Sequence, residues 1–171
     1  MINASLEEFT FSNCSASFEQ PQFPCKDAMQ EGGKGWAYLG RLPAFITLQL
    51  ENSTAEISQI ELNSNSIHAN HWPTRFMIEL FKNGRWTRPG WLDIIEPSDA
   101  YYEQSTGEIE VVDVPNKKTV IKFDPITGVS LIRLNIYDSA AHNGNAVIEQ
   151  IKALGAFPQS EYHLQVPTPF G

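Results

Sequence analysis

Hydrophobic and polar residues alternate along much of the chain, with the period of two that is typical of β-strands with one buried face. Six segments show this alternation: 45–50 (FITLQL), 57–63 (ISQIELN), 75–81 (RFMIELF), 108–114 (EIEVVDV), 119–123 (TVIKF) and 130–137 (SLIRLNIY). Segments rich in Gly, Pro, Asn and Asp separate them, which indicates turns. The pattern predicts an all-β protein, an antiparallel β-sandwich or jelly roll.

One turn and the C-terminal region give more specific predictions. Asn83 and Gly84 in KNGRW favour a tight hairpin turn, with Trp86 on the returning strand. AVIEQIKALG, Ala146–Gly155, has a helical propensity, but its β-branched residues also suit a closing strand, and we predict a strand. We therefore expect a β-sandwich over residues 1–155, followed at 156–171 by an extended tail or a linker with three prolines.

Length and charge narrow the classes of partner. A chain of 171 residues can bury one core, and no apolar run approaches the roughly 20 residues that cross a bilayer, so we expect a soluble domain. The first residues, MINASLEEFTF, lack the pattern of a secretory signal. The formal charge of −8 disfavours nucleic acid and anionic membranes, which bind clustered Lys and Arg. Cys14 and Cys25 would close a small loop, and the sequence leaves their pairing open.

The order of these elements resembles the discoidin, or coagulation factor 5/8 type C, domains and the family 32 carbohydrate-binding modules. The matching segments run from CSASFE and DAMQEGGKGWAY through PAFITLQLENSTAEISQIEL and RFMIELFKNGRW to VSLIRLNIY and NAVIEQIKALG. The resemblance covers roughly Phe9 to Gly155 and implies a galactose-binding-like jelly roll. It also favours an extracellular or cell-surface location.

The resemblance further implies a structural calcium ion. Many relatives hold the ion through a turn before a tryptophan and through an AxxE motif in the last strand. In this chain the corresponding residues are Asp27, Gln30, Ala146 and Glu149. Gln30 stands where relatives have Asp, and a neutral amide oxygen attracts calcium less than a carboxylate does. Alternatively, Glu149 is an ordinary strand residue.

In this family ligands bind at loops on one end of the sandwich, and SIHANHWPTR at 66–75 joins two predicted strands at such a loop. Trp72 would offer its indole face to a pyranose ring. Polar contacts to the sugar hydroxyls would come from His68, Asn70, His71 and Arg75. The alternative is that Trp72 folds inward and caps the sandwich, because tryptophan is usually largely buried.

The resemblance adds secondary ligand contacts from other loops, namely Tyr38, Arg41 and, in the DSAAHNGNA segment, Asn143. Trp36 and Trp86 match core positions of the family, and we also expect Trp91 to be buried. His68 and His71 alone do not indicate zinc, since no further ligand lies at a recognisable spacing.

The sequence contains no recognisable catalytic set. No G-x-S-x-G occurs, the acids are scattered, and EGGKG lacks the spacing of a phosphate-binding loop. We therefore expect a non-catalytic module that binds a glycan, as part of a larger multidomain protein or assembly. One alternative is a protein-interaction or adhesion module that uses the same loops, and another is an enzyme with hydrolytic or lyase activity that no motif reveals. The sequence does not identify the sugar.

Overall fold

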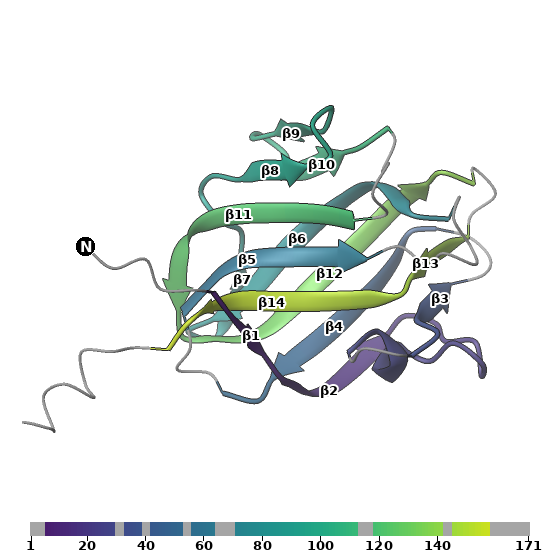
Figure 1. The fold of residues 1–171 in the computed structure, drawn as a ribbon, viewed down its shortest axis with the longest axis horizontal. Coiled ribbons are helices and arrows are strands. Elements are labelled where there is room, and N and C mark those ends of the chain that lie inside the picture. The colour runs from purple at the N-terminus through teal and green to yellow at the C-terminus, as the bar shows by residue number, and fades with distance from the viewer. Residues whose placement is uncertain are drawn as a thin grey trace, which may run out of the picture.

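The computed structural model describes residues 6–29, 33–38, 42–52, 56–63, 71–112, 118–141 and 145–157. They form two antiparallel β-sheets stacked as a sandwich, as predicted (Figure 1). The five-stranded sheet contains, in spatial order, β1 (Glu7–Phe9), β14 (Gln150–Ala156), β5 (Glu56–Asn63), β11 (Lys118–Thr127) and β8 (Asp93–Glu96). The seven-stranded sheet contains β2 (Phe11–Ala16), β4 (Ala44–Leu50), β12 (Val129–Ser139), β6 (Pro73–Lys82), β10 (Glu108–Glu110) and β9 (Tyr101–Glu103), with β7 (Arg85–Thr87) beside β6.

A third, two-stranded sheet lies at one end of the sandwich. It pairs β3 (Trp36–Tyr38) with β13 (Ala146–Ile148). The helical structure within the described ranges is a short 3₁₀ turn, η1 (Cys25–Ala28). In the same part of the chain, no helix has the length and apolar character that crossing a membrane requires.

The alternating pattern places one face of each strand in the core. On β6 the side chains of Phe76, Ile78 and Leu80 are buried, and the residues between them are partly exposed. The register sets Leu134 of β12 opposite both Ile78 of β6 and Ile46 of β4, so these buried side chains pack within one layer. Burial of such side chains contributes about 25 cal/mol per Å² of apolar surface, which makes this layer the main stabilising feature of the fold.

The predicted strands are confirmed with two changes in extent. Within the described part of the segment 108–114, the strand is Glu108–Glu110. The Val111 N–H still donates to the Thr74 carbonyl at 2.9 Å, and residues 113 and 114 lie outside the described residues. The C-terminal strand is divided at Glu149, whose N–H donates to the Asn63 carbonyl at 2.8 Å.

The hairpin at Asn83 and Gly84 is also confirmed. Both residues have positive φ angles, 54° and 78°, as a tight turn between β6 and β7 requires. Trp86 follows on β7, but it is not a core residue. It is half-buried on the outer face of the seven-stranded sheet, where it packs edge-on against Phe81.

The two remaining predictions for tryptophans have opposite outcomes. Trp36 is fully buried, as predicted. The prediction that Trp91 is buried is wrong, because this side chain is 50% exposed. Trp91 follows Pro89 and Gly90 outside the strands, where it is not held on the inner face of a sheet, while the next residue, Leu92, packs against the core.

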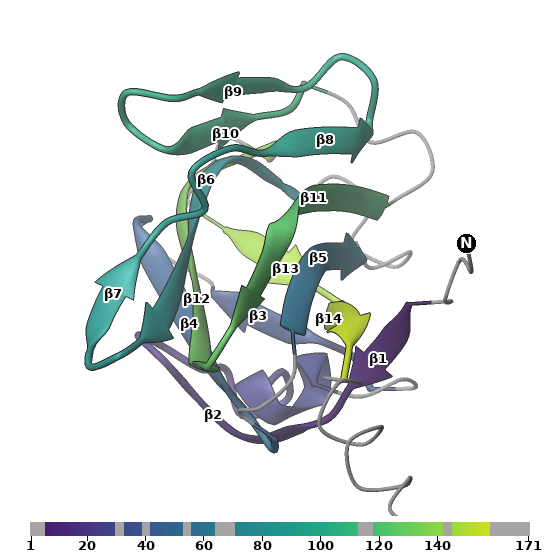
Figure 2. The same cartoon turned by 90° about the vertical axis from the view of Figure 1, so that its left-hand side faces the viewer.

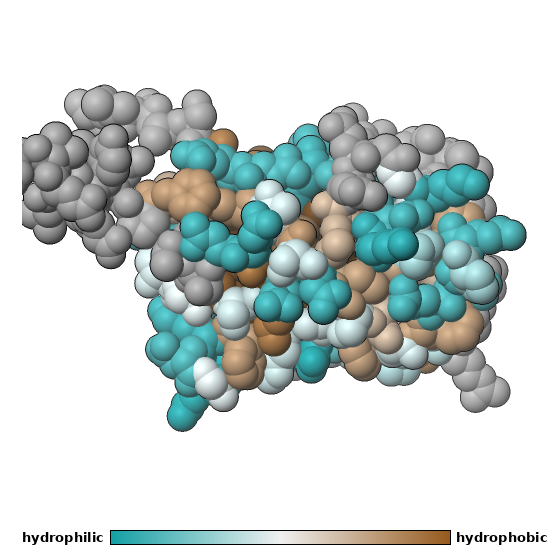
Figure 3. All heavy atoms as spheres, turned by 90° about the horizontal axis from the view of Figure 1, so that it is seen from below, coloured by the Kyte–Doolittle hydropathy of each residue, from teal (hydrophilic) through white to brown (hydrophobic). Residues whose placement is uncertain are grey.

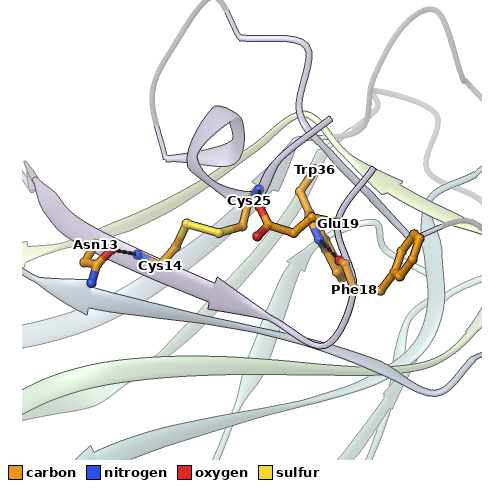
Figure 4. Close-up of a disulfide and its surroundings, with 6 residues drawn as sticks. All are labelled: Asn13, Cys14, Phe18, Glu19, Cys25 and Trp36. Carbon is orange, nitrogen blue, oxygen red and sulfur yellow. Dashed lines mark hydrogen bonds between the residues drawn. A yellow bond between two sulfur atoms is a disulfide. The ribbon is translucent and has the colours of Figure 1, made fainter. Parts of the chain in front are cut away.

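The N-terminal corner is cross-linked by a disulfide between Cys14 on β2 and Cys25 on η1, which resolves the pairing that the sequence left open (Figure 4). Two hydrogen bonds lie beside it. The Cys25 N–H donates to Glu19 Oε1 at 2.6 Å, and the Trp36 indole N–H donates to the Phe18 carbonyl at 2.9 Å. The disulfide and the two hydrogen bonds join β2, η1 and β3 into one rigid corner.

The sandwich has two long edges. The lower edge in Figure 1, formed by β1, β2 and η1, is seen directly in Figure 3, where hydrophobic and hydrophilic residues are interspersed. The opposite edge is formed by the short strands β8, β9 and β10, which lie together at the top of Figure 2.

Candidate functional site

Backbone hydrogen bonds bring the predicted ligand-binding segments together at one end of the sandwich. The Val147 N–H donates to the His71 carbonyl at 3.0 Å, and the Ala140 N–H donates to the Trp72 carbonyl at 3.0 Å. The strand pair β3–β13 then sets Tyr38 opposite Ala146. This end lies on the right in Figure 1, where β5 and β12 end and β6 and β13 begin.

Trp72 lies immediately before β6 and is only partly exposed. Its indole packs against the hydrophobic core, and its Nε1 atom is buried with no hydrogen-bond partner within the described ranges. The sequence analysis offered two alternatives, an indole displayed to a ligand and an indole folded onto the core. Trp72 combines both in part, because it packs against the core and is still partly exposed. A substitution of Trp72 is expected to change both the stability and any ligand binding at this end.

Tyr38 packs against the disulfide-linked corner of the fold. Its ring packs edge-on against Phe18, with the centroids 5.4 Å apart and an interplanar angle of 82°. Phe18 is 41% exposed and was not among the predicted site residues. The sequence signal for it is weak, because an aromatic residue in a loop with prolines is as consistent with packing as with display. Together these rings form an aromatic pair beside β13.

Arg75 lies on a different surface from Trp72. The register places it as an outward-facing residue of β6, opposite Glu110 and Asp138. Its guanidinium contacts Glu108 Oε1 at 3.4 Å and lies over the Tyr137 ring, 5.3 Å from the centroid. Burial, followed by the charges of Glu108 and Glu79, raises the pKa of Tyr137 above its ordinary value, and Arg75 partly opposes this. Arg75 thus belongs to a charged cluster on the outer face of the seven-stranded sheet.

Several predicted residues lie outside the described residues. These are His68, Asn70, Arg41 and Asn143 for the ligand and Gln30 for calcium. On either side of the segment that carries Asn143, the Ser139 hydroxyl donates to the Asn145 carbonyl, which links the end of β12 to the residue before β13.

The residues expected to hold calcium lie around one backbone segment. A Cβ atom added to Gly33 would lie 2.5 Å from the Asp27 carbonyl, and one added to Gly35 would lie 2.7 Å from Glu149 Cα. Residues 33–35 therefore run between Asp27 and Glu149, and Ala146 is buried nearby at the start of β13. No group of three or more His, Cys, Asp or Glu side chains suited to a metal occurs within the described ranges. Two carboxylates with additional backbone and amide oxygens would suit calcium, so the calcium site stays a prediction.

Comparisons with known proteins add information at the level of the fold. No protein-family model and no curated protein sequence matches this chain. The family 32 carbohydrate-binding module of NanJ from Clostridium perfringens, solved with galactose, superposes with a TM-score of 0.64 at 18% identity, over 86% of this chain and 99% of that one. The module CpGH89CBM32-5 from Clostridium perfringens, solved with GalNAc-β-1,3-galactose, gives 0.61 at 17% identity, over 84% and 94%.

A third similar structure contains more than one domain. It holds the modules CBM32-1 and CBM32-2 and the M60 catalytic domain of ZmpB from Clostridium perfringens, and it gives a TM-score of 0.61 at 9% identity over 90% of this chain and 15% of that one. At these identities the likeness establishes the fold. The chain has the β-sandwich of the family 32 carbohydrate-binding modules, so the fold that the sequence resemblance implied is confirmed.

Proposed function

We propose that the chain is a non-catalytic carbohydrate-binding module whose glycan site lies at the end of the sandwich that contains Tyr38, His71 and Trp72. The observation that carries the proposal is the pair of backbone hydrogen bonds from Val147 and Ala140 to the His71 and Trp72 carbonyls. These bonds join residues 71 and 72 to residues 140 and 147, and the pairing of β13 with β3 adds Tyr38, so aromatic and imidazole groups far apart in sequence lie at one end. Sugar sites combine these two kinds of group.

The accessible part of the Trp72 ring and the Phe18–Tyr38 pair supply apolar surfaces for the C–H faces of a sugar. The neighbouring polar residues supply hydrogen bonds to its hydroxyls. No proton transfer or covalent step is needed for this function. Sites of this shallow kind bind with a Kd of roughly 0.01–1 mM, because most sugar hydroxyls exchange water for protein at little net gain.

The similar structures in complex with galactose and with GalNAc-β-1,3-galactose make galactose-containing glycans the first ligands to test. By the same reasoning we propose that the chain functions as a targeting module within a larger multidomain protein, the arrangement seen in ZmpB.

The test is a glycan array, followed by calorimetry with the best ligand, on the wild type and three variants, Tyr38→Ala, Trp72→Phe and Trp91→Ala. Tyr38→Ala is expected to weaken binding about three- to tenfold, because one aromatic contact is worth about 0.5–1.5 kcal/mol. Trp91→Ala is the matched control, since Trp91 is half-exposed but lies at the start of β8, away from these segments. Binding that survives Tyr38→Ala and Trp72→Phe but is lost in Trp91→Ala would overturn the placement of the site.

A further inference from the structure

Exposed apolar side chains concentrate on one edge of the sandwich. We define the β8–β10 flap as residues 91–112. It contains Trp91, Ile95, Tyr101 and Val112, whose exposed fractions are 50%, 49%, 59% and 75%. Each exposed ring or aliphatic side chain forgoes the stabilisation that burial would provide. Large apolar side chains gathered in this way are typical of surfaces that bind a partner.

The flap also holds an open edge of each sheet. β8 ends the five-stranded sheet and β9 ends the seven-stranded sheet, so neither strand is paired with a further strand on its outer side in the described chain, and β8 and β9 lie close to each other. Figure 2 shows both strands at the same edge of the sandwich. Open edges present unpaired N–H and C=O groups, to which an extended peptide can add as a further strand.

The negative charge of the flap favours a positively charged partner. Residues 91–112 contain six acidic residues, Asp93, Glu96, Asp99, Glu103, Glu108 and Glu110, and no lysine or arginine. Glu103 lies directly opposite Glu108 in the β9–β10 ladder, a like-charge arrangement that disfavours the pair by itself. Arg75 offsets this charge through Glu108. Two copies of such an edge repel each other, which argues against self-association, while a cationic segment is attracted.

We propose that the β8–β10 flap is a docking site for a basic polypeptide segment. The segment lies extended along the edge, with apolar side chains on Ile95 and Tyr101 and with lysine or arginine side chains near Glu103 and Glu110. This proposal is independent of the glycan site, which lies at the end of the sandwich and involves different residues.

The experiment titrates the intact protein with a synthetic (Lys-Val)₄ peptide and with (Glu-Val)₄ as the opposite-charge control. Binding is followed by calorimetry, and the site is mapped by NMR shifts of the backbone amides. The basic peptide is expected to bind more weakly at higher salt and to shift the amides of β8 and β9, and the acidic peptide is expected not to bind.

Matched variants distinguish a specific docking site on the flap from a general electrostatic attraction between the basic peptide and the acidic protein. The double substitution Glu103→Gln and Glu110→Gln should lower the affinity for the basic peptide roughly three- to tenfold, as expected for the loss of two exposed ion pairs. The control is Glu7→Gln with Glu8→Gln, because β1 is also an edge strand with two exposed glutamates but its third residue, Phe9, is buried. Ile95→Thr, which keeps the β-branched side chain but removes apolar surface, is also expected to lower the affinity for the peptide.

Three results would overturn the proposal: no binding of the basic peptide, equal weakening by both double substitutions, or amide shifts that map away from β8 and β9. If substitution of Trp91 or Tyr101 abolished glycan binding and left peptide binding unchanged, the flap would instead be a sugar-binding surface. Glycan binding by the wild type, measured in parallel, tests the proposed function separately.

Discussion

The guanidinium of Arg133 lies over the indole of Trp86, with its Cζ atom 4.1 Å from the ring centroid. The same carbon is 5.0 Å from the centroid of the Phe45 ring, and Arg133 Nε donates to Thr47 Oγ1 at 3.0 Å. One side chain on β12 thereby connects β4 and β7 across the outer face of the seven-stranded sheet. It gives this face a packed layer, although the strand alternation predicts a solvated one.

Arg133→Met is expected to lower the free energy of unfolding by about 2 kcal/mol, through loss of two cation–π contacts and one hydrogen bond. Arg133→Lys keeps the charge but not the planar stacking, so it should lose about half as much. Urea denaturation of the three proteins measures the difference. Equal stability of the methionine variant and the wild type would contradict the stacking role.

Gly35→Ala is expected to destabilise the protein by about 2 kcal/mol, because Gly35 has φ +94° and an added Cβ would lie 2.5 Å from the Ile148 carbonyl. The clash would push β13 and the adjoining β3 apart at the proposed glycan-binding end. Gly90→Ala is the control, since nothing lies within 4 Å of its added Cβ. Thermal unfolding should give a lower melting temperature for Gly35→Ala than for Gly90→Ala. Equal melting temperatures would show that β13 accommodates the added Cβ atom with no loss of stability.

Tyr101→Phe is expected to raise the pKa of Glu103. In the wild type the Tyr101 hydroxyl, at 2.6 Å from Glu103 Oε1, and then the Ser105 hydroxyl hold this pKa below its ordinary value. A lowered pKa stabilises the folded state above the ordinary pKa of glutamate, and the contribution disappears as the pH falls through the lowered value. NMR titration of the Glu103 side chain measures the change. An unchanged pKa in the variant would mean that the hydrogen bond does not persist in solution.

Calcium is expected to raise the melting temperature of the wild type if Asp27 and Glu149 help to hold the ion. At a concentration 100 times the Kd, a ligand that binds only the folded state adds about 3 kcal/mol. Glu149→Gln should remove most of this gain, whereas Glu51→Gln, at an exposed position outside the proposed calcium ligands, should keep it. Unfolding curves with calcium and with a chelator make the comparison, and identical curves for the wild type would refute the site.

The alternating pattern predicts the fold because each long strand, such as β6 or β12, has one apolar face that must be buried. It predicts less about short strands. β8 and β9 have three or four residues each, and their pairing depends on neighbours distant in sequence. The disulfide likewise depends on how β2 and η1 approach each other, which spacing alone does not determine.

The position of a tryptophan relative to the core also depends on tertiary structure. Trp36, Trp86 and Trp91 all follow turn residues, yet one is fully buried, one packs on an outer face and one is half-exposed. The resemblance to a known family assigned Trp36 to the core correctly, but it also assigned Trp86 there, and this side chain packs on the outer face of the seven-stranded sheet. The resemblance did not reveal the flap, since exposure there follows from two sheet edges that meet only in the folded protein.

The pairing of β1 with β14 has a consequence for how this unit can be joined to others. Glu7 lies opposite Gly155, at the end of the sandwich away from Tyr38 and Trp72 (Figure 1). A polypeptide that enters before β1 and one that leaves after β14 therefore share a single point of attachment. The unit can be inserted into a loop of a host protein, or fused at either side, with the end that carries Tyr38 and Trp72 still facing outward.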